Sequence, residues 1–163
     1  MKKHIWISGT MNSGKSTVAK LLSKKLSYAI IELDRFSENV CEFMDFSAYI
    51  DLNYAMISEI VALYEKNNIL CIIVYPINNK RYQELPSMFV SLCTFFSIDP
   101  SIEVALSSRG KDRILDSFAR DRIEYHYGEG KLYEVDFAER IFTKDMTPEQ
   151  TSDVIFLKMQ STV

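Results

Sequence analysis

The most informative segment of this 163-residue chain is Gly9-Thr10-Met11-Asn12-Ser13-Gly14-Lys15-Ser16. It matches the phosphate-binding loop pattern G-x-x-x-x-G-K-[ST] at every fixed position. The apolar run Ile5-Trp6-Ile7 precedes it, and a run with helical spacing of apolar residues, Thr17 to Leu26, follows it. The sequence therefore predicts a strand, a glycine-rich loop and a helix, in that order.

Each part of this loop has an expected role in holding a triphosphate. Gly9 and Gly14 allow the backbone to wrap a phosphate closely, and the helix that begins near Lys15 adds the positive end of its dipole. We expect Lys15 to reach the β- and γ-phosphates and the Ser16 hydroxyl to bind Mg²⁺. Thr17 either adds a hydroxyl near the α-phosphate or only begins the helix. The candidate nucleotide-binding residues are Gly9, Thr10, Met11, Asn12, Ser13, Gly14, Lys15, Ser16 and Thr17.

Composition predicts one domain, residues 1–163, of ordinary globular type. Hydrophobic residues make up 47% of the chain and charged residues 25%, and the net charge of −3 gives no nucleic-acid-binding signature. The three cysteines are widely spaced, which indicates buried, reduced thiols in a cytoplasmic protein rather than a metal cluster. We expect no signal peptide, no membrane-spanning segment and no membrane partner, and a monomer or homodimer.

The alternation of apolar runs and helical patterns predicts an α/β fold with a parallel sheet covered on both faces. Asp99-Pro100 suggests a helix N-cap followed by proline at the first helical position, and Thr147 to Gln150 suggests a capping box. The expected strands are His4–Ser8, Tyr28–Leu33, Ile69–Tyr75, Val90–Ser97 and about Arg140–Thr143. The expected helices are Gly14–Lys25, about Arg35–Phe46, Ala48–Lys66, Lys80–Leu85, the segment from Asp99 to about Ser107, Lys111–Tyr125 and the segment after Thr147.

These motifs resemble the small P-loop kinases of metabolites and drugs: shikimate kinase, gluconate kinase, adenylylsulfate kinase and chloramphenicol phosphotransferase. The resemblance covers Gly9 to Leu22, the strand end Ile31-Glu32-Leu33-Asp34, the Thr143–Glu149 junction that commonly packs near adenine, and an arginine-bearing lid at about 109–127. Shikimate kinases carry a glycine triplet where this chain has Pro76-Ile77-Asn78-Asn79. The resemblance implies a P-loop NTPase three-layer sandwich with a five-stranded parallel sheet of order 2-3-1-4-5. It also implies ATP and Mg²⁺ as cofactors and a small-molecule acceptor.

Two acidic residues follow the second predicted strand. Asp34 is placed where the strand should end, at the edge of the sheet that holds ligands in open α/β folds. It can accept the proton of an attacking hydroxyl or orient Mg²⁺ through water, and otherwise it caps the next helix. Glu32 shares a strand face with Asp34 and is a weaker candidate for the metal.

Several cations are placed to meet the phosphate or the acceptor. Arg109 and Arg113 lie one helical turn apart and could stabilise the transferring phosphate together, unless the segment is only a solvated, salt-bridged helix. Arg35, Lys80 and Arg81 are expected near the acceptor, or else form exposed basic turns. Arg120 and Arg122 are weaker candidates. His126, between Tyr125 and Tyr127, is more typical of a packing residue than of a catalytic base.

The sequence separates the main classes of phosphate-loop protein. A GTPase switch requires D-x-x-G and N-K-x-D motifs, and neither occurs in this sequence. An ATPase motor usually ends its third strand in an acidic residue, whereas this chain has Tyr75-Pro76 there. The expected function is therefore ATP-dependent transfer of the γ-phosphate to a hydroxyl of a small molecule. A nucleoside or nucleotide kinase, or a nucleotide-binding protein without catalysis, stays open as an alternative.

Overall fold

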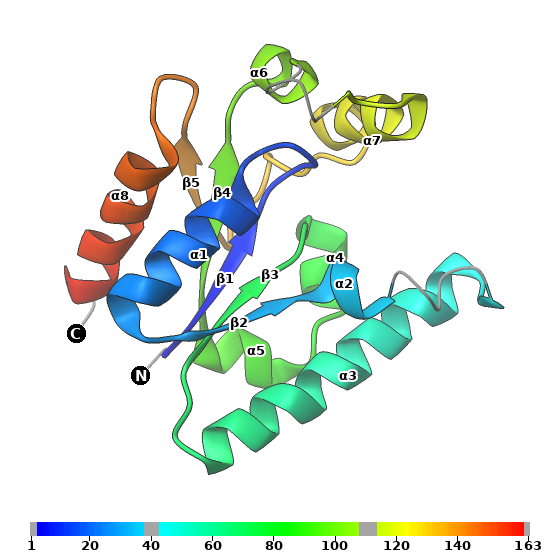
Figure 1. Cartoon of the computed structure of the whole chain (residues 1–163). Coiled ribbons are helices and arrows are strands. Elements are labelled where there is room, and N and C mark those ends of the chain that lie inside the picture. Colours follow the sequence, from blue (N-terminus) through cyan, green and yellow to red (C-terminus); the bar gives the residue numbers. More distant parts are fainter. Residues whose placement is uncertain (1–2, 38–42, 108–113, 162–163) are drawn as a thin grey trace.

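The computed structural model describes residues 3–37, 43–107 and 114–161 and contains a five-stranded parallel sheet (Figure 1). The strand order is β2-β3-β1-β4-β5, as predicted, and each neighbouring pair is parallel. The strands are β1 (His4–Ser8), β2 (Ala29–Glu32), β3 (Cys71–Val74), β4 (Cys93–Asp99) and β5 (Glu139–Phe142). Because all strands are parallel, the loops after their carboxyl ends meet at one edge of the sheet.

Helices connect the strands and cover both faces of the sheet, which gives the predicted three layers (Figure 1). The helices are α1 (Lys15–Leu26), α2 (Leu33–Ser37), α3 (Phe46–Lys66), α4 (Asn79–Gln83), α5 (Ser87–Leu92), α6 (Ile102–Leu106), α7 (Ser117–Tyr127) and α8 (Pro148–Ser161). Among the described residues, none of the helices combines the length and the apolar character needed to cross a bilayer.

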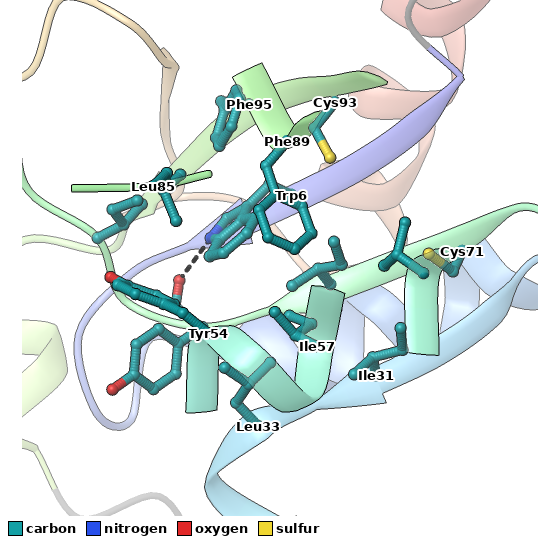
Figure 2. Close-up of a cluster of buried hydrophobic side chains, with 14 of the residues drawn as sticks. Trp6, Ile31, Leu33, Tyr54, Ile57, Cys71, Leu85, Phe89, Cys93 and Phe95 are labelled. Atoms are coloured by element: carbon teal, nitrogen blue, oxygen red, sulfur yellow. Dashed lines mark hydrogen bonds between the residues drawn. The ribbon is translucent and has the colours of Figure 1, made fainter. Parts of the chain in front are cut away.

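Alternate residues of the central strand enter two separate cores, because successive side chains of a strand point to opposite faces. Ile5 and Ile7 pack with α1 and α8 on one face. Trp6 packs on the other face with α3 and α5, where its indole Nε1 donates a hydrogen bond to the Tyr75 carbonyl at 2.9 Å (Figure 2). The sheet is thus buried on both sides and gives the site a rigid edge.

The structure corrects the predicted boundaries at several places. The helix expected over Lys111–Tyr125 begins at Ser117, where Asp116 caps it, and the helix expected over about Arg35–Phe46 is interrupted, since Met44 and Asp45 are not helical. Asp99 does not cap a helix: it is the last residue of β4, and Ser101 caps α6 by accepting from the Val104 amide. Val90–Leu92 belongs to α5 rather than to the fourth strand, and β2 ends at Glu32, so Asp34 lies in the first turn of α2. A helical pattern can continue into a strand without a visible break, because apolar residues suit both.

Other local predictions are confirmed. The capping box at α8 is present: the Thr147 amide donates to Gln150 Oε1 at 2.8 Å, and the Gln150 amide donates to Thr147 Oγ1 at 3.2 Å. Cys71 and Cys93 are buried thiols, as expected for structural cysteines, whereas Cys41 lies outside the described residues.

Candidate functional site

The phosphate loop has backbone angles that require its glycines. Gly9 has φ 154°, and a Cβ there would lie 2.7 Å from Ser13 Oγ and 2.9 Å from the Ile98 carbonyl. Gly14 has φ 87° and precedes α1 without a side chain that could cap the helix. The first amides of α1 therefore begin directly at the loop, which is the arrangement of an anion site at a helix N-terminus.

Lys15 is held inside this loop. Its side chain is buried, and its Nζ donates a hydrogen bond to the Thr10 carbonyl at 3.1 Å. A buried ammonium requires such partners, because burial without them strongly disfavours the charge. Ser16 and Thr17 follow in the first turn of α1, where Ser16 is half-buried and Thr17 is exposed. The cation and the candidate metal-binding hydroxyl thus lie at the start of the same helix.

A small cavity of about 20 Å³ adjoins the loop on one side. It brings the loop together with the junction between β5 and α8, which the sequence resemblance placed near adenine. The residues that line it are Ser13, Gly14, Val18, Ile98, Thr143, Met146, Pro148 and Thr151. We call it the base-side cavity.

A larger cavity, of about 90 Å³, is connected to the loop through His126, which lines it and contacts Thr10 at 2.8 Å. Its walls come from α3, the segment after β3, α4, α7 and the turn that follows α7. The residues that line it are Ile50, Tyr75, Pro76, Asn78, Arg81, Arg122, Tyr125, His126 and Leu132. We call it the acceptor-side cavity. It contains two guanidinium groups and two tyrosines, and none of its described lining residues is acidic.

Asp34 lies near this second cavity. It is exposed, in the first turn of α2, and its negative charge helps burial to raise the pKa of Tyr75, which lines the cavity. The second strand ends at Glu32, one residue earlier than predicted, but the Asp34 carboxylate still lies at the ligand edge of the sheet. Glu32, two residues earlier, is engaged by Arg35, whose Nε is 2.5 Å from Glu32 Oε2.

The predicted basic residues fall into different places. Arg81 lines the acceptor-side cavity and also pairs with Glu84 at 2.7 Å, whereas Lys80 is exposed on α4. Arg35 is mostly exposed and is not among the residues lining either cavity. Arg109 and Arg113 lie outside the described residues. Arg122, the weaker candidate from the same predicted lid, lines the cavity from α7.

Sequence reasoning missed a polar cluster around Asp99. The carboxylate is almost fully buried and receives hydrogen bonds from the Tyr127 hydroxyl at 2.6 Å and the Ser101 amide at 3.0 Å. Arg140 Nη2 pairs with its other oxygen at 2.5 Å, and burial with the Asp99 hydrogen bond raises the pKa of Tyr127. Asp99 could have been found from the sequence by the same pattern that identified Asp34, namely an acidic residue at the end of a buried strand.

His126 is another residue whose position the sequence did not reveal. It is buried on α7 rather than merely packed among tyrosines, and its Nδ1 lies 2.8 Å from the Thr10 hydroxyl. Burial and the positive charges of Arg122 and Lys15 lower its pKa to about 3. The ring is therefore neutral at physiological pH and connects the phosphate loop to the acceptor-side cavity.

Comparison with known proteins supports the fold and the assignment of the phosphate-loop segment. The family model of shikimate kinase matches residues 11–54, which include most of the loop, α1 and β2. No protein among those with curated functions shows significant sequence similarity to the chain.

Solved structures share the fold over nearly the whole chain. A sugar kinase from Janibacter sp. HTCC2649 superposes with a TM-score of 0.72 at 16% identity, covering 98% of this chain and 95% of that one. Shikimate kinase from Aquifex aeolicus gives 0.69 at 22% identity, covering 98% and 97%. A gluconokinase from Sinorhizobium meliloti gives 0.65 at 16% identity, covering 98% and 97%. The chain thus has the fold of the small P-loop metabolite kinases and resembles the shikimate kinase family in sequence over residues 11–54.

Proposed function

We propose that this protein is an ATP-dependent phosphotransferase that moves the γ-phosphate of ATP to a hydroxyl of a small molecule. The observation that carries the proposal is that the phosphate loop has a contact with each of the two cavities. Ser13 and Gly14 line the base-side cavity, and Thr10 contacts His126, which lines the acceptor-side cavity. Two ligands bound in these cavities would meet at the loop, as transfer between them requires.

The nucleotide would bind through the loop from Gly9 to Thr17. Its β- and γ-phosphates would bind to the Lys15 ammonium and the first amides of α1, and its base would reach the base-side cavity. The chemical types of Ser16 and Asp34 suit Mg²⁺, which is usually bound through one or two carboxylates, a hydroxyl and the substrate phosphates. Mg²⁺, when bound, would neutralise charge on the phosphate oxygens.

The acceptor would lie in the acceptor-side cavity with its hydroxyl directed toward Asp34. This carboxylate would accept the proton of the attacking hydroxyl or hold the metal, and Arg81 and Arg122 would orient the acceptor. Planar guanidinium groups bind carboxylate or phosphate groups in pairs of hydrogen bonds, so an acceptor with hydroxyls and an anionic group fits this lining.

The rest of the chain would serve the same reaction. We propose that residues 1–163 form one kinase domain and that the segment 109–127 is its lid, which would exclude water and bring Arg109 and Arg113 to the γ-phosphate. Excluding water matters because the same geometry would otherwise hydrolyse ATP.

A substrate panel tests this function. ADP release would be measured with hydroxylated metabolites, hydroxy acids, antibiotics and nucleosides, each compared with the release seen without an acceptor. We expect at least one hydroxylated acceptor to raise ADP release well above that background, and Lys15→Ala to abolish the increase. A response to nucleosides alone would favour the nucleoside kinase alternative. Nucleotide binding without any acceptor-dependent turnover, across a broad panel, would contradict the proposal.

A further inference from the structure

Thr10 is a junction of hydrogen bonds at the start of the phosphate loop. It is completely buried, and each of its polar groups has a partner. Its amide donates to the Tyr133 hydroxyl at 3.0 Å, its carbonyl accepts from Lys15 Nζ at 3.1 Å, and its hydroxyl lies 2.8 Å from His126 Nδ1. Two of these three partners come from segments more than a hundred residues away in the sequence.

The contact with His126 joins the loop to one wall of the acceptor-side cavity. His126 belongs to α7, and the same helix contributes Arg122 and Tyr125 to that wall. Figure 1 shows α7 at the end of the sheet where the loop between β1 and α1 lies. A displacement of α7 would therefore either break the Thr10–His126 hydrogen bond or move the loop residue with it.

The hydrophobic packing of α7 does not by itself explain this histidine. Ile123 and Ala119 already anchor the helix by burying apolar side chains. A neutral, buried imidazole is costly unless its nitrogen atoms are hydrogen-bonded, and an apolar residue would fill the same space without that requirement. The polar contact therefore adds a directional connection between loop and helix.

We propose that His126 is a positioning residue that couples the acceptor-side wall to the nucleotide loop through Thr10. The proposal rests on the proposed function, since it assigns the loop to a nucleotide and the cavity to an acceptor. When a nucleotide fixes the loop, Thr10 is fixed with it, and the hydrogen bond holds α7 against the acceptor. A ligand that binds only the ordered loop stabilises every element that is ordered together with it.

Hydrogen exchange measures this coupling directly. The probe is the non-hydrolysable ATP analogue AMP-PNP with Mg²⁺, added at saturation as judged by calorimetry. In the unmodified protein we expect exchange of the α7 amides to slow by about threefold or more when the analogue binds. His126→Leu should still bind the analogue but lose most of this slowing.

Conservative variants separate positioning from packing. His126→Asn places an amide about where Nδ1 lies, so it should restore the response, whereas His126→Gln extends its amide too far and should not. Phe118→Ala is the control on the same helix: its side chain is exposed, so the response should be retained. If His126→Leu fails to fold, Thr10→Val tests the other partner, with Thr10→Ser as its conservative form.

The outcomes distinguish the two proposals. If calorimetry gives no binding heat for the analogue, the proposed function fails and this inference with it. If the analogue binds but α7 exchange is unchanged, or if His126→Leu keeps the full response, the coupling is refuted while the proposed function stands. Loss of the response in His126→Leu with restoration in His126→Asn supports the coupling.

Discussion

The phosphate loop and the acceptor-side cavity adjoin each other but are built in opposite ways. Nine consecutive residues, Gly9 to Thr17, make the loop, and its geometry depends on two glycines with positive φ. The cavity takes its lining from α3, the segment after β3, α4, α7 and the turn at Leu132. Local backbone chemistry therefore determines the first, and long-range packing determines the second. Substitutions should therefore affect the two regions differently.

Removing the ammonium of the loop should have the largest effect. For Lys15→Ala we expect acceptor-dependent turnover to fall by roughly a thousandfold, because a cation that meets developing phosphate charge is lost. The rise in melting temperature on adding Mg²⁺ and ATP should disappear as well. Lys20→Ala, an exposed lysine on the same helix, is the control. Normal turnover in Lys15→Ala would contradict the assignment of this loop to the nucleotide-binding site.

The carboxylate at the acceptor side should affect chemistry rather than nucleotide binding. Asp34→Asn should lower turnover by roughly a hundredfold, as loss of a general base does, with little change in ATP affinity. Turnover and calorimetric affinity would be measured on the same preparation, with the exposed Asp51→Asn as control. If ATP affinity falls in parallel with turnover, Asp34 acts through the metal. Unchanged turnover would leave it with a purely structural role.

The histidine that joins the two regions should make stability depend on pH. Burial and neighbouring positive charges hold the His126 pKa at about 3, below its ordinary 6.5, so the unfolded chain binds a proton that the folded protein does not. This contribution to stability is complete above about pH 6.5 and is lost progressively as pH falls toward 3, at about 1.4 kcal/mol per unit. Between pH 6.5 and 5 the loss is about 2 kcal/mol.

His126→Asn should remove this part of the pH dependence, because asparagine does not titrate. Urea unfolding at pH 7, 6 and 5 would compare the two proteins, and their free energies of unfolding should converge as the pH falls. His4, which also has a lowered pKa, is present in both proteins and so cancels in the difference. Parallel curves for the two proteins would show that His126 is not the group that titrates.

The smallest effect concerns the backbone of the loop. Gly9→Ala places a Cβ against Ser13 Oγ and the Ile98 carbonyl at a φ that favours glycine, so the loop must shift. We expect nucleotide affinity to fall by roughly tenfold, since such strain costs about 1–3 kcal/mol and part of it is relieved by movement. Gly128→Ala, whose Cβ would meet only the Glu124 carbonyl at 3.3 Å, should bind nucleotide normally. Equal effects of the two changes would contradict the steric argument.

Features that depend on neighbouring residues were predictable from the sequence alone. The loop, its flanking strand and helix, the sheet order through the family resemblance, and the capping box at Thr147 all follow from short patterns with local physical causes. Element ends were less accurate where an apolar helix meets an apolar strand, as at Val90–Leu92, because both structures bury the same residues.

The contacts between distant side chains became known only from the folded chain. Arg81 and Arg122 share one cavity, Asp99 binds Tyr127 and Arg140, and Thr10 binds His126. None of these pairs has a spacing that a helix or strand repeat would reveal, because parallel strands bring the ends of separate segments to one edge. Burial then selects the contacts, since a polar group removed from water must find whichever partner the fold places beside it.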